Sequence, residues 1–154
     1  MVTIGTPNTD TATRILILGA NEISKETAIE AQRLGLEVIA VDGQEEAPAM
    51  QVAHRAHVIH MRDPDELKAL IEREKPHIII PATEFVCAET LIAAEEQGIV
   101  VAPTARAAAL GCDRAGIREL VSKELDIPTS PYRIATTMAD YWSNIGQIGF
   151  PCVV

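Results

Sequence analysis

The sequence predicts an α/β fold in which a central parallel sheet carries helices on both faces. Five short runs rich in β-branched residues alternate with polar or amphipathic segments, and this alternation is typical of β-α-β units with parallel strands. The runs are RILILG (14–19), LEVIAVD (36–42), AHVIHM (56–61), HIIIPA (77–82) and GIVVAP (98–103). The chain has 154 residues, of which 47% are hydrophobic, so it is long enough for a compact domain with its own core.

The turn after the first strand departs from the dinucleotide-binding fingerprint. That fingerprint needs glycine at three places, which here hold Gly19, Asn21 and Ser24. Side chains at 21 and 24 block the close backbone approach that a pyrophosphate needs. The carboxylate of Glu22 would also repel a pyrophosphate, whereas it accepts hydrogen bonds from ribose hydroxyls or pairs with an amine. The turn is therefore suited to a sugar or an amine.

Asp42 ends the second strand, where a dinucleotide-binding enzyme holds a ribose hydroxyl. It is the best argument for a nicotinamide cofactor, and the altered glycines of the first turn outweigh it. His54, His57 and His60 resemble a metal motif, but side chains alternate along a strand, so His57 and His60 point to opposite faces. The sequence therefore predicts no metal site, and it offers no catalytic residue.

The helix after the third strand is marked by its own capping residues. Asp63 can cap it, Pro64 takes the first helical position, and Glu66 can complete a capping box. The apolar residues expected to face the sheet are Leu67, Leu70 and Ile71.

Two further helices are predicted in the second half of the chain. One spans Glu84 to Gln97 and is stopped by Gly98, and the other starts at Asp113. The residues expected to point inward are Cys87, Leu91 and Ala94 in the former, and Ile117, Leu120, Val121 and Leu125 in the latter.

The usual strand order of such folds locates the site. Right-handed crossovers place the strand Ile15 to Leu18 in the centre of the sheet, beside the strand His77 to Ile80. Winding reverses between these two strands, and ligands of open α/β sheets bind there, outside the carboxyl ends of the strands. We therefore expect a site between GANEIS (19–24) and PATEF (81–85), with Glu22 and Glu84 pointing toward one crevice.

Composition excludes several classes of partner. A formal net charge of −9 and few aromatic residues argue against a nucleic-acid binder. Cys87, Cys112 and Cys152 form no CxxC pair, so we expect reduced thiols. The first fourteen residues hold no apolar stretch typical of a signal peptide, and no later run reaches membrane-spanning length. We expect a cytoplasmic protein that does not bind membranes.

The chain resembles a known family along nearly its whole length. The runs that carry the resemblance are TRILILG, SKETAIEAQRLGLEVIAVD, APAMQVAHRAHVIHMRD, EKPHIIIP and IPTSPYR, of which APAMQVAHRAHVI is long and unusual. They resemble formate-dependent phosphoribosylglycinamide formyltransferase, the ATP-grasp transformylase of purine biosynthesis. The resemblance implies a Rossmann-like preATP-grasp domain over 14–126, after an N-terminal extension (1–13). It also implies a linker and the first elements of an ATP-grasp domain over 127–154, with a strand at 149–154.

The resemblance also implies substrates and site residues. In this family, ATP, formate and glycinamide ribonucleotide give formyl-glycinamide ribonucleotide through formyl phosphate. Glu22 and Ile23 match the pair that contacts glycinamide ribonucleotide, Glu84 matches a family glutamate, and Arg114 matches an arginine beside ATP. A second substrate-binding glutamate is replaced by Ala82. ATP and magnesium are expected in the full-length enzyme, which is expected to be a homodimer, and no cofactor is expected to bind this chain tightly.

The resemblance leaves the role of the isolated chain to be decided. The family continues into a Lys-Pro and a glycine-rich loop that clamps ATP, so the 154 residues alone are expected to be inactive, and ATP-dependent formyltransferase activity requires the full-length protein. Ile23 begins an apolar stripe with Thr27, Ala31 and Leu34, so we expect it to pack in the core and to contact a ligand through its backbone. The alternatives are a related ATP-grasp carboxylase of purine synthesis and a non-catalytic ligand-binding or dimerisation module, which Ala82 favours.

Overall fold

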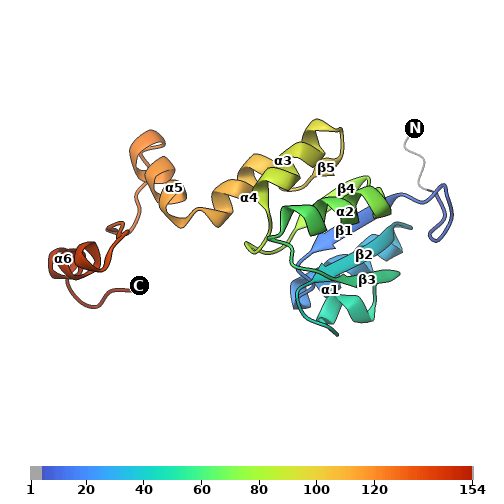
Figure 1. Ribbon diagram of the computed structural model, residues 1–154, viewed down its shortest axis with the longest axis horizontal. Helices are drawn as coiled ribbons and strands as arrows, with labels where there is room; N and C mark the ends of the chain where they lie inside the picture. The colour runs from blue at the N-terminus through green and yellow to red at the C-terminus, as the bar shows by residue number, and fades with distance from the viewer. Residues whose placement is uncertain (1–4, 154) are drawn as a thin grey trace. The chain divides into compact units, whose positions relative to one another are not determined.

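The computed structural model describes residues 5–153, and this part of the chain divides into two compact units between Cys112 and Asp113 (Figure 1). The first unit contains one sheet, whose five strands all run parallel in the order β3-β2-β1-β4-β5. The strands are β1 (Arg14–Leu18), β2 (Glu37–Asp42), β3 (Arg55–Val58), β4 (Ile78–Pro81) and β5 (Val100–Val101). Each of the five strands predicted for the sheet is present, and β1 lies between β2 and β4 as expected.

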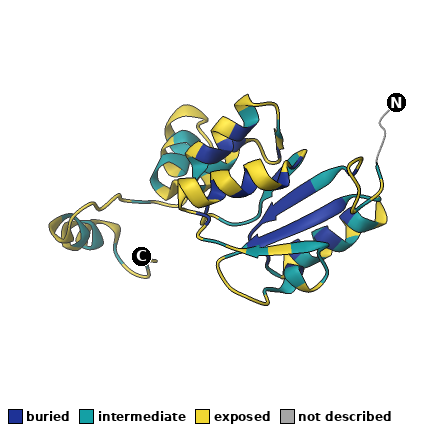
Figure 2. Cartoon of the chain, turned by 45° about the vertical axis from the view of Figure 1, so that its right-hand side comes forward, coloured by how far each residue is buried: buried dark blue, intermediate teal, exposed yellow. Residues whose placement is uncertain are grey.

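Helices cover both faces of this sheet, which confirms the predicted fold class. Successive residues of β1 point to opposite faces. Ile15 and Ile17 pack with Ala28 and Ala31 of α1 (Glu22–Arg33). Leu16 and Leu18 belong to a larger cluster built with α2 (Pro64–Glu74), α3 (Ala88–Glu96) and α4 (Ala105–Cys112). Figure 2 shows the central strands as the most continuously buried part of the chain.

The start of α2 follows the prediction except at Glu66. Asp63 accepts hydrogen bonds from the N–H groups of Asp65 and Glu66, at 2.9 and 3.1 Å, and Pro64 is the first helical residue. Glu66 does not complete a capping box, because its carboxylate accepts the N–H of His60 at 2.8 Å. The predicted inward residues Leu67, Leu70 and Ile71 are buried.

The helix α3 begins at Ala88, so the prediction of a helix from Glu84 was wrong at its start. Thr83 Oγ1 accepts the N–H of Phe85 at 3.2 Å, and the N–H of Cys87 donates to the carbonyl of Met61 at 2.8 Å. These bonds keep residues 82–87 in a loop. Leu91 and Ala94 are buried, and Gly98 follows the helix with a φ of +92°.

The second unit contains α5 (Arg114–Glu119), a π-helical turn (Leu120–Glu124) and α6 (Met138–Ile148). The helix α5 starts where predicted, and Asp113 caps it by accepting the N–H groups of Ala115 and Gly116. None of residues 113–153 is fully buried. Of the residues predicted to point inward, Ile117, Leu120 and Val121 are half-buried, whereas Leu125 is 54% exposed, so the prediction was wrong for Leu125. Without a sheet, this unit offers its helices little apolar surface to pack against.

Two features of the second half of the chain differ from the sequence prediction. Residues 149–153 form no strand, and Val154 lies outside the described residues. The helix α6 was not predicted, although Thr137 and Asp140 form a capping box at its start. Among the helices of residues 5–153, none is both long enough and apolar enough to cross a membrane.

Candidate functional site

The turn after β1 and the loop after β4 lie against each other, as the strand order predicts. The N–H of Ala82 donates to the carbonyl of Leu18 at 2.7 Å, and Asn21 Nδ2 donates to the carbonyl of Ala82 at 3.4 Å. A Cβ at Gly19 would lie 2.9 Å from the side chain of Thr83, and Gly19 has a φ of +95°. Only glycine fits there without strain, because the conformation and the contact both exclude a side chain.

The residues that replace the fingerprint glycines are used to build the turn itself. Asn21 caps α1, where its side-chain oxygen accepts the N–H of Ser24 at 3.0 Å. Ser24 is buried, and its hydroxyl donates to the carbonyl of Gly19 at 2.5 Å. A pyrophosphate over this turn would have to displace these side chains, which agrees with the prediction that the turn suits another ligand.

Asp42 also forms hydrogen bonds with the backbone of the protein itself. Its Oδ2 accepts the N–H of Ala20 at 2.7 Å, and its Oδ1 accepts the N–H of Gln44 at 3.2 Å. The sequence placed Asp42 where a ribose hydroxyl would bind in a dinucleotide-binding enzyme. In this fold the carboxylate instead joins the end of β2 to the turn after β1, which removes the main argument for a nicotinamide cofactor.

Glu22 and Ile23 lie at the start of α1, and both side chains are exposed. Ile23 is 79% exposed, so the prediction that it packs in the core was wrong. The buried stripe of α1 consists of Ser24, Ala28 and Ala31, and it begins one residue later than the sequence analysis assumed. Ile23 therefore presents its side chain, and not only its backbone, beside Glu22.

The loop after β4 contributes acidic and aromatic side chains to the same edge of the sheet. Glu84 is exposed in this loop, two residues after Ala82. Phe85 is 55% exposed, and the guanidinium carbon of Arg62 lies 4.7 Å from the centre of its ring. The sequence analysis missed this cation–π pair, because Arg62 follows β3 and meets Phe85 only in the folded chain.

The first unit coincides with a known domain. Residues 12–111 match the family model described as the ribonucleotide synthetase preATP-grasp domain. The chain belongs to this family. The preATP-grasp assignment was made from sequence resemblance, and both the family match and the parallel sheet confirm it. Arg114 lies outside the matched residues, as the first residue of α5 in the second unit.

Known relatives place this preATP-grasp domain within longer proteins. A formate-dependent phosphoribosylglycinamide formyltransferase of Nitratidesulfovibrio vulgaris is 58% identical over all of this chain and 39% of that protein. The solved glycinamide-RNase-transformylase T of Mycobacterium tuberculosis is 42% identical, with a TM-score of 0.73 over 77% of this chain and 37% of that one. An N5-carboxyaminoimidazole synthetase of Staphylococcus aureus complexed with ADP is 25% identical, with a TM-score of 0.70 over 90% of this chain and 37% of that one.

The chain therefore spans about two fifths of the length of the relatives it matches, and it corresponds to the N-terminal part of the transformylases.

The opposite edge of the preATP-grasp sheet is its amino edge, where the amino ends of the strands meet. It holds an ion-pair network built around buried carboxylates. Glu37 has a side chain only 1% exposed and accepts hydrogen bonds from Arg14 Nε at 3.2 Å, Arg55 Nη2 at 2.7 Å and the N–H of Asn8. Arg55 Nε also donates to Glu74 at 3.0 Å. Burial raises the pKa of Glu37, but the bonds from Arg55, Asn8 and Arg14 outweigh it and hold that pKa below 4.5.

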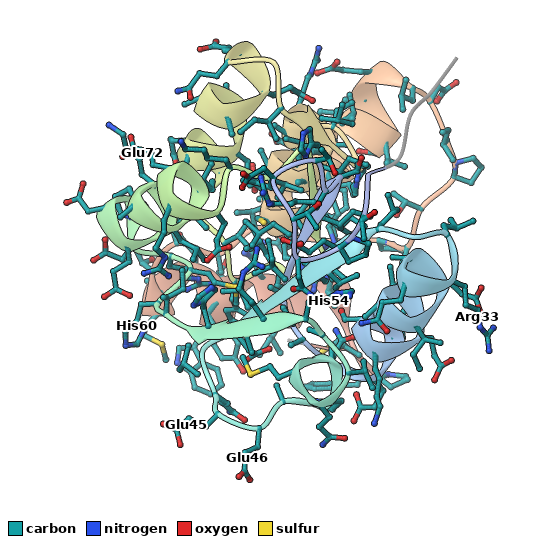
Figure 3. All side chains as sticks on the ribbon, turned by 90° about the vertical axis from the view of Figure 1, so that its right-hand side faces the viewer. Arg33, Glu45, Glu46, His54, His60 and Glu72 are labelled. Atoms are coloured by element: carbon teal, nitrogen blue, oxygen red, sulfur yellow. The ribbon has the colours of Figure 1, made fainter. Side chains whose placement is uncertain are left out.

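The same network engages a histidine that the sequence analysis considered for metal binding. His57 Nε2 lies 2.8 Å from Glu74 Oε1. Burial raises the pKa of Glu74, and hydrogen bonds from Arg55 and His57 lower it overall. His54 Nδ1 accepts the N–H of Val38 at 3.0 Å and is half-buried, whereas His60 is exposed; both are labelled in Figure 3. The three histidines thus have separate positions and separate roles.

Proposed function

We propose that this chain is the N-terminal substrate-binding domain of a formate-dependent glycinamide ribonucleotide transformylase, an enzyme of purine biosynthesis. Its role is to supply one wall of the glycinamide ribonucleotide site. The observation that carries the proposal is the structure of the turn after β1, where the winding of the chain reverses. That turn is closed to a pyrophosphate by Asn21 and Ser24, yet it presents Glu22 and Ile23 to solvent. The 58% identity to a transformylase over all of this chain supports the same substrate.

The exposed side chains at the carboxyl edge suit a ribonucleotide that carries an amine. A carboxylate accepts hydrogen bonds from ribose hydroxyls and from an ammonium or amine group. Glu22 is the first residue of α1, and its carboxylate is exposed to solvent. We assign Glu22 to the polar part of glycinamide ribonucleotide, Ile23 to an apolar contact beside it, and Glu84 to the opposite side. The domain thereby orients the amine for attack on the activated formyl group.

We assign ATP binding to the full-length enzyme, with Arg114 beside the nucleotide. The ADP bound to the related synthetase of Staphylococcus aureus supports the use of ATP. Magnesium would bind together with the phosphates of ATP. Within residues 5–153, no three His, Cys, Asp or Glu side chains are grouped to hold a metal ion, so we assign the metal to protein outside this chain.

The domain limits proposed for the full-length enzyme are an N-terminal extension (1–13), a preATP-grasp domain (14–126), and a linker with the first elements of the ATP-grasp domain (127–154). The family match over residues 12–111 supports the central assignment. We further propose that the enzyme is a cytoplasmic homodimer, because that is what the resemblance to the transformylases implies. The isolated chain is proposed to bind substrate without catalysing the reaction.

A second candidate is a non-catalytic ligand-binding or dimerisation module. It is favoured by Ala82, which takes the place of a substrate-binding glutamate in the family that this chain resembles. The side chain of Ala82 packs against the apolar cluster around Ile15 and Ile17, where it offers a ligand no charge. A related carboxylase of purine synthesis is distinguished from the transformylase by which ribonucleotide binds.

An NMR titration of the chain with glycinamide ribonucleotide tests the proposal. We expect amide shifts to cluster at residues 19–24 and 82–86, and to vanish in Glu22→Ala. Aminoimidazole ribonucleotide serves as the competing ligand for the carboxylase alternative. An absence of shifts at saturating glycinamide ribonucleotide would overturn the substrate assignment and favour the non-catalytic module.

A further inference from the structure

The residue that connects the proposed substrate turn to the rest of the sheet is Asp42. It is half-buried at the end of β2, next to β1, and both of its carboxylate oxygens accept backbone N–H groups. The bond from Ala20 is the shorter of the two, at 2.7 Å. Hydrogen bonds to an ionised acceptor are stronger than those between neutral groups. The end of β2 therefore holds the turn after β1 by a charge-assisted bond.

Ala20 is held from both sides. Its N–H donates to Asp42, and its carbonyl accepts the N–H of Ala49 at 2.9 Å. The preceding residue is held as well, because the N–H of Gly19 donates to the carbonyl of Val41 at 2.8 Å. Ala20 is fully buried, and Glu22 follows it by two residues. The position at which α1 starts is thus set by bonds that do not involve Glu22 itself.

We propose that Asp42 is a positioning residue for Glu22 and Ile23, which fixes the turn before the ligand arrives. This inference rests on the proposed function, because it takes glycinamide ribonucleotide as the ligand of the turn. A flexible turn has to be ordered when the ligand binds, and the lost conformational entropy weakens binding. Asp42 removes that cost by ordering the turn in the free protein. It touches the substrate at no step.

A matched control separates positioning from general stability. Asp63 also accepts two backbone N–H groups, at 2.9 and 3.1 Å, and both of these belong to α2. Asp42→Ala and Asp63→Ala each remove a carboxylate that accepts two backbone N–H groups. Both substitutions are expected to lower the free energy of unfolding by similar amounts. Only Asp42→Ala removes a bond to the substrate turn.

The experiment measures the affinity for glycinamide ribonucleotide by NMR titration of the wild-type chain and the two variants, together with amide hydrogen exchange. We expect Asp42→Ala to raise the Kd roughly tenfold, since fixing the backbone of about one residue costs a factor of that order. Asp63→Ala should leave the Kd unchanged. Exchange at the Ala20 amide should accelerate in Asp42→Ala and remain at the wild-type rate in Asp63→Ala.

Each other outcome has a distinct meaning. If the wild-type chain binds and Asp42→Ala binds equally well, the positioning role is overturned while the proposed function stands. If the wild-type chain does not bind glycinamide ribonucleotide, the proposed function fails and the inference fails with it. A measurement on the wild type alone gives a test that does not depend on the folding of a variant. Exchange at Ala20 should already be slow without ligand, and strong slowing by ligand would show that the ligand, not Asp42, orders the turn.

Discussion

At the amino edge of the sheet, the carboxylates of Glu37 and Glu74 are buried and are bound by partly exposed arginines, whereas at the carboxyl edge Glu22 and Glu84 are exposed. The buried carboxylate of Glu37 needs several donors, because a charge removed from water is costly unless it is paired. At the carboxyl edge, Asp42, Asn21 and Ser24 bind the backbone. One edge thus uses charge to hold the fold together, and the other exposes charge at the proposed ligand site.

The largest effect is expected from breaking the amino-edge network. Arg55→Ala leaves Glu37 and Glu74 buried without the cation that bridges them, and we expect a loss of about 3 kcal/mol in the free energy of unfolding. Urea denaturation measures this loss. The control is Arg33→Ala, which removes an exposed pair with Glu30 and should change stability by less than about 0.5 kcal/mol. Equal effects of the two substitutions would show that burial gives the amino-edge ion pairs no greater role in stability than an exposed pair has.

The opposite pattern is expected for Glu22→Ala at the carboxyl edge. Loss of a charge-assisted contact should weaken binding of glycinamide ribonucleotide by about 2 kcal/mol. Stability should change by no more than about 1 kcal/mol, through the lost interaction with the dipole of α1. Calorimetric titration and urea denaturation measure the two quantities. Glu26→Ala, an exposed carboxylate further along the same helix, is the control that should retain wild-type affinity.

The amino-edge network also predicts a dependence of stability on acid pH. The folded-state pKa values of Glu37 and Glu74 lie below the ordinary value of 4.5, because burial raises each pKa but the hydrogen bonds and charges of all their partners together outweigh it. Their stabilisation is therefore complete above pH 4.5 and is lost as the pH falls through the folded-state pKa values. The effect is smaller than that of Arg55→Ala, because protonation leaves the arginine in place. Denaturation experiments between pH 7 and pH 3 give the free energy of unfolding at each pH. This free energy should vary less with pH in Glu37→Gln than in the wild type, and an unchanged pH dependence would refute the assignment.

Features encoded by neighbouring residues could be predicted from the sequence. Runs of β-branched residues located all five strands, and the crossover rule placed β1 beside β4. Asp63 and Asp113 cap helices through bonds to residues two and three positions along the chain, so their roles were visible in the sequence. Glu22 and Glu84 were placed at the correct edge for the same reason, since each follows a correctly identified strand.

Features that depend on contacts between distant segments were missed. The start of α3 is delayed by a loop held to Met61, and Asp42 finds Ala20 only because β1 and β2 are neighbours. The network around Glu37 had a signal in the sequence, a glutamate within an apolar strand, but its partners Arg14 and Arg55 begin two other strands. The buried stripe of α1 was predicted to begin one residue too early, because the position of the sheet relative to the helix decides which side chains are buried.

Because the buried stripe of α1 does not include Ile23, the substitution Ile23→Ala is expected to have the smallest effect. A buried isoleucine would cost several kcal/mol on truncation, but a side chain that is 79% exposed should cost less than about 0.5 kcal/mol. The affinity for glycinamide ribonucleotide should fall about threefold, because the bound ligand would bury less apolar surface of the protein. Ala31→Gly, in the buried stripe of the same helix, should do the reverse by lowering stability and leaving the affinity of the folded protein unchanged. A large loss of stability in Ile23→Ala would mean that the side chain packs in the core after all, and the apolar contact assigned to it would be withdrawn.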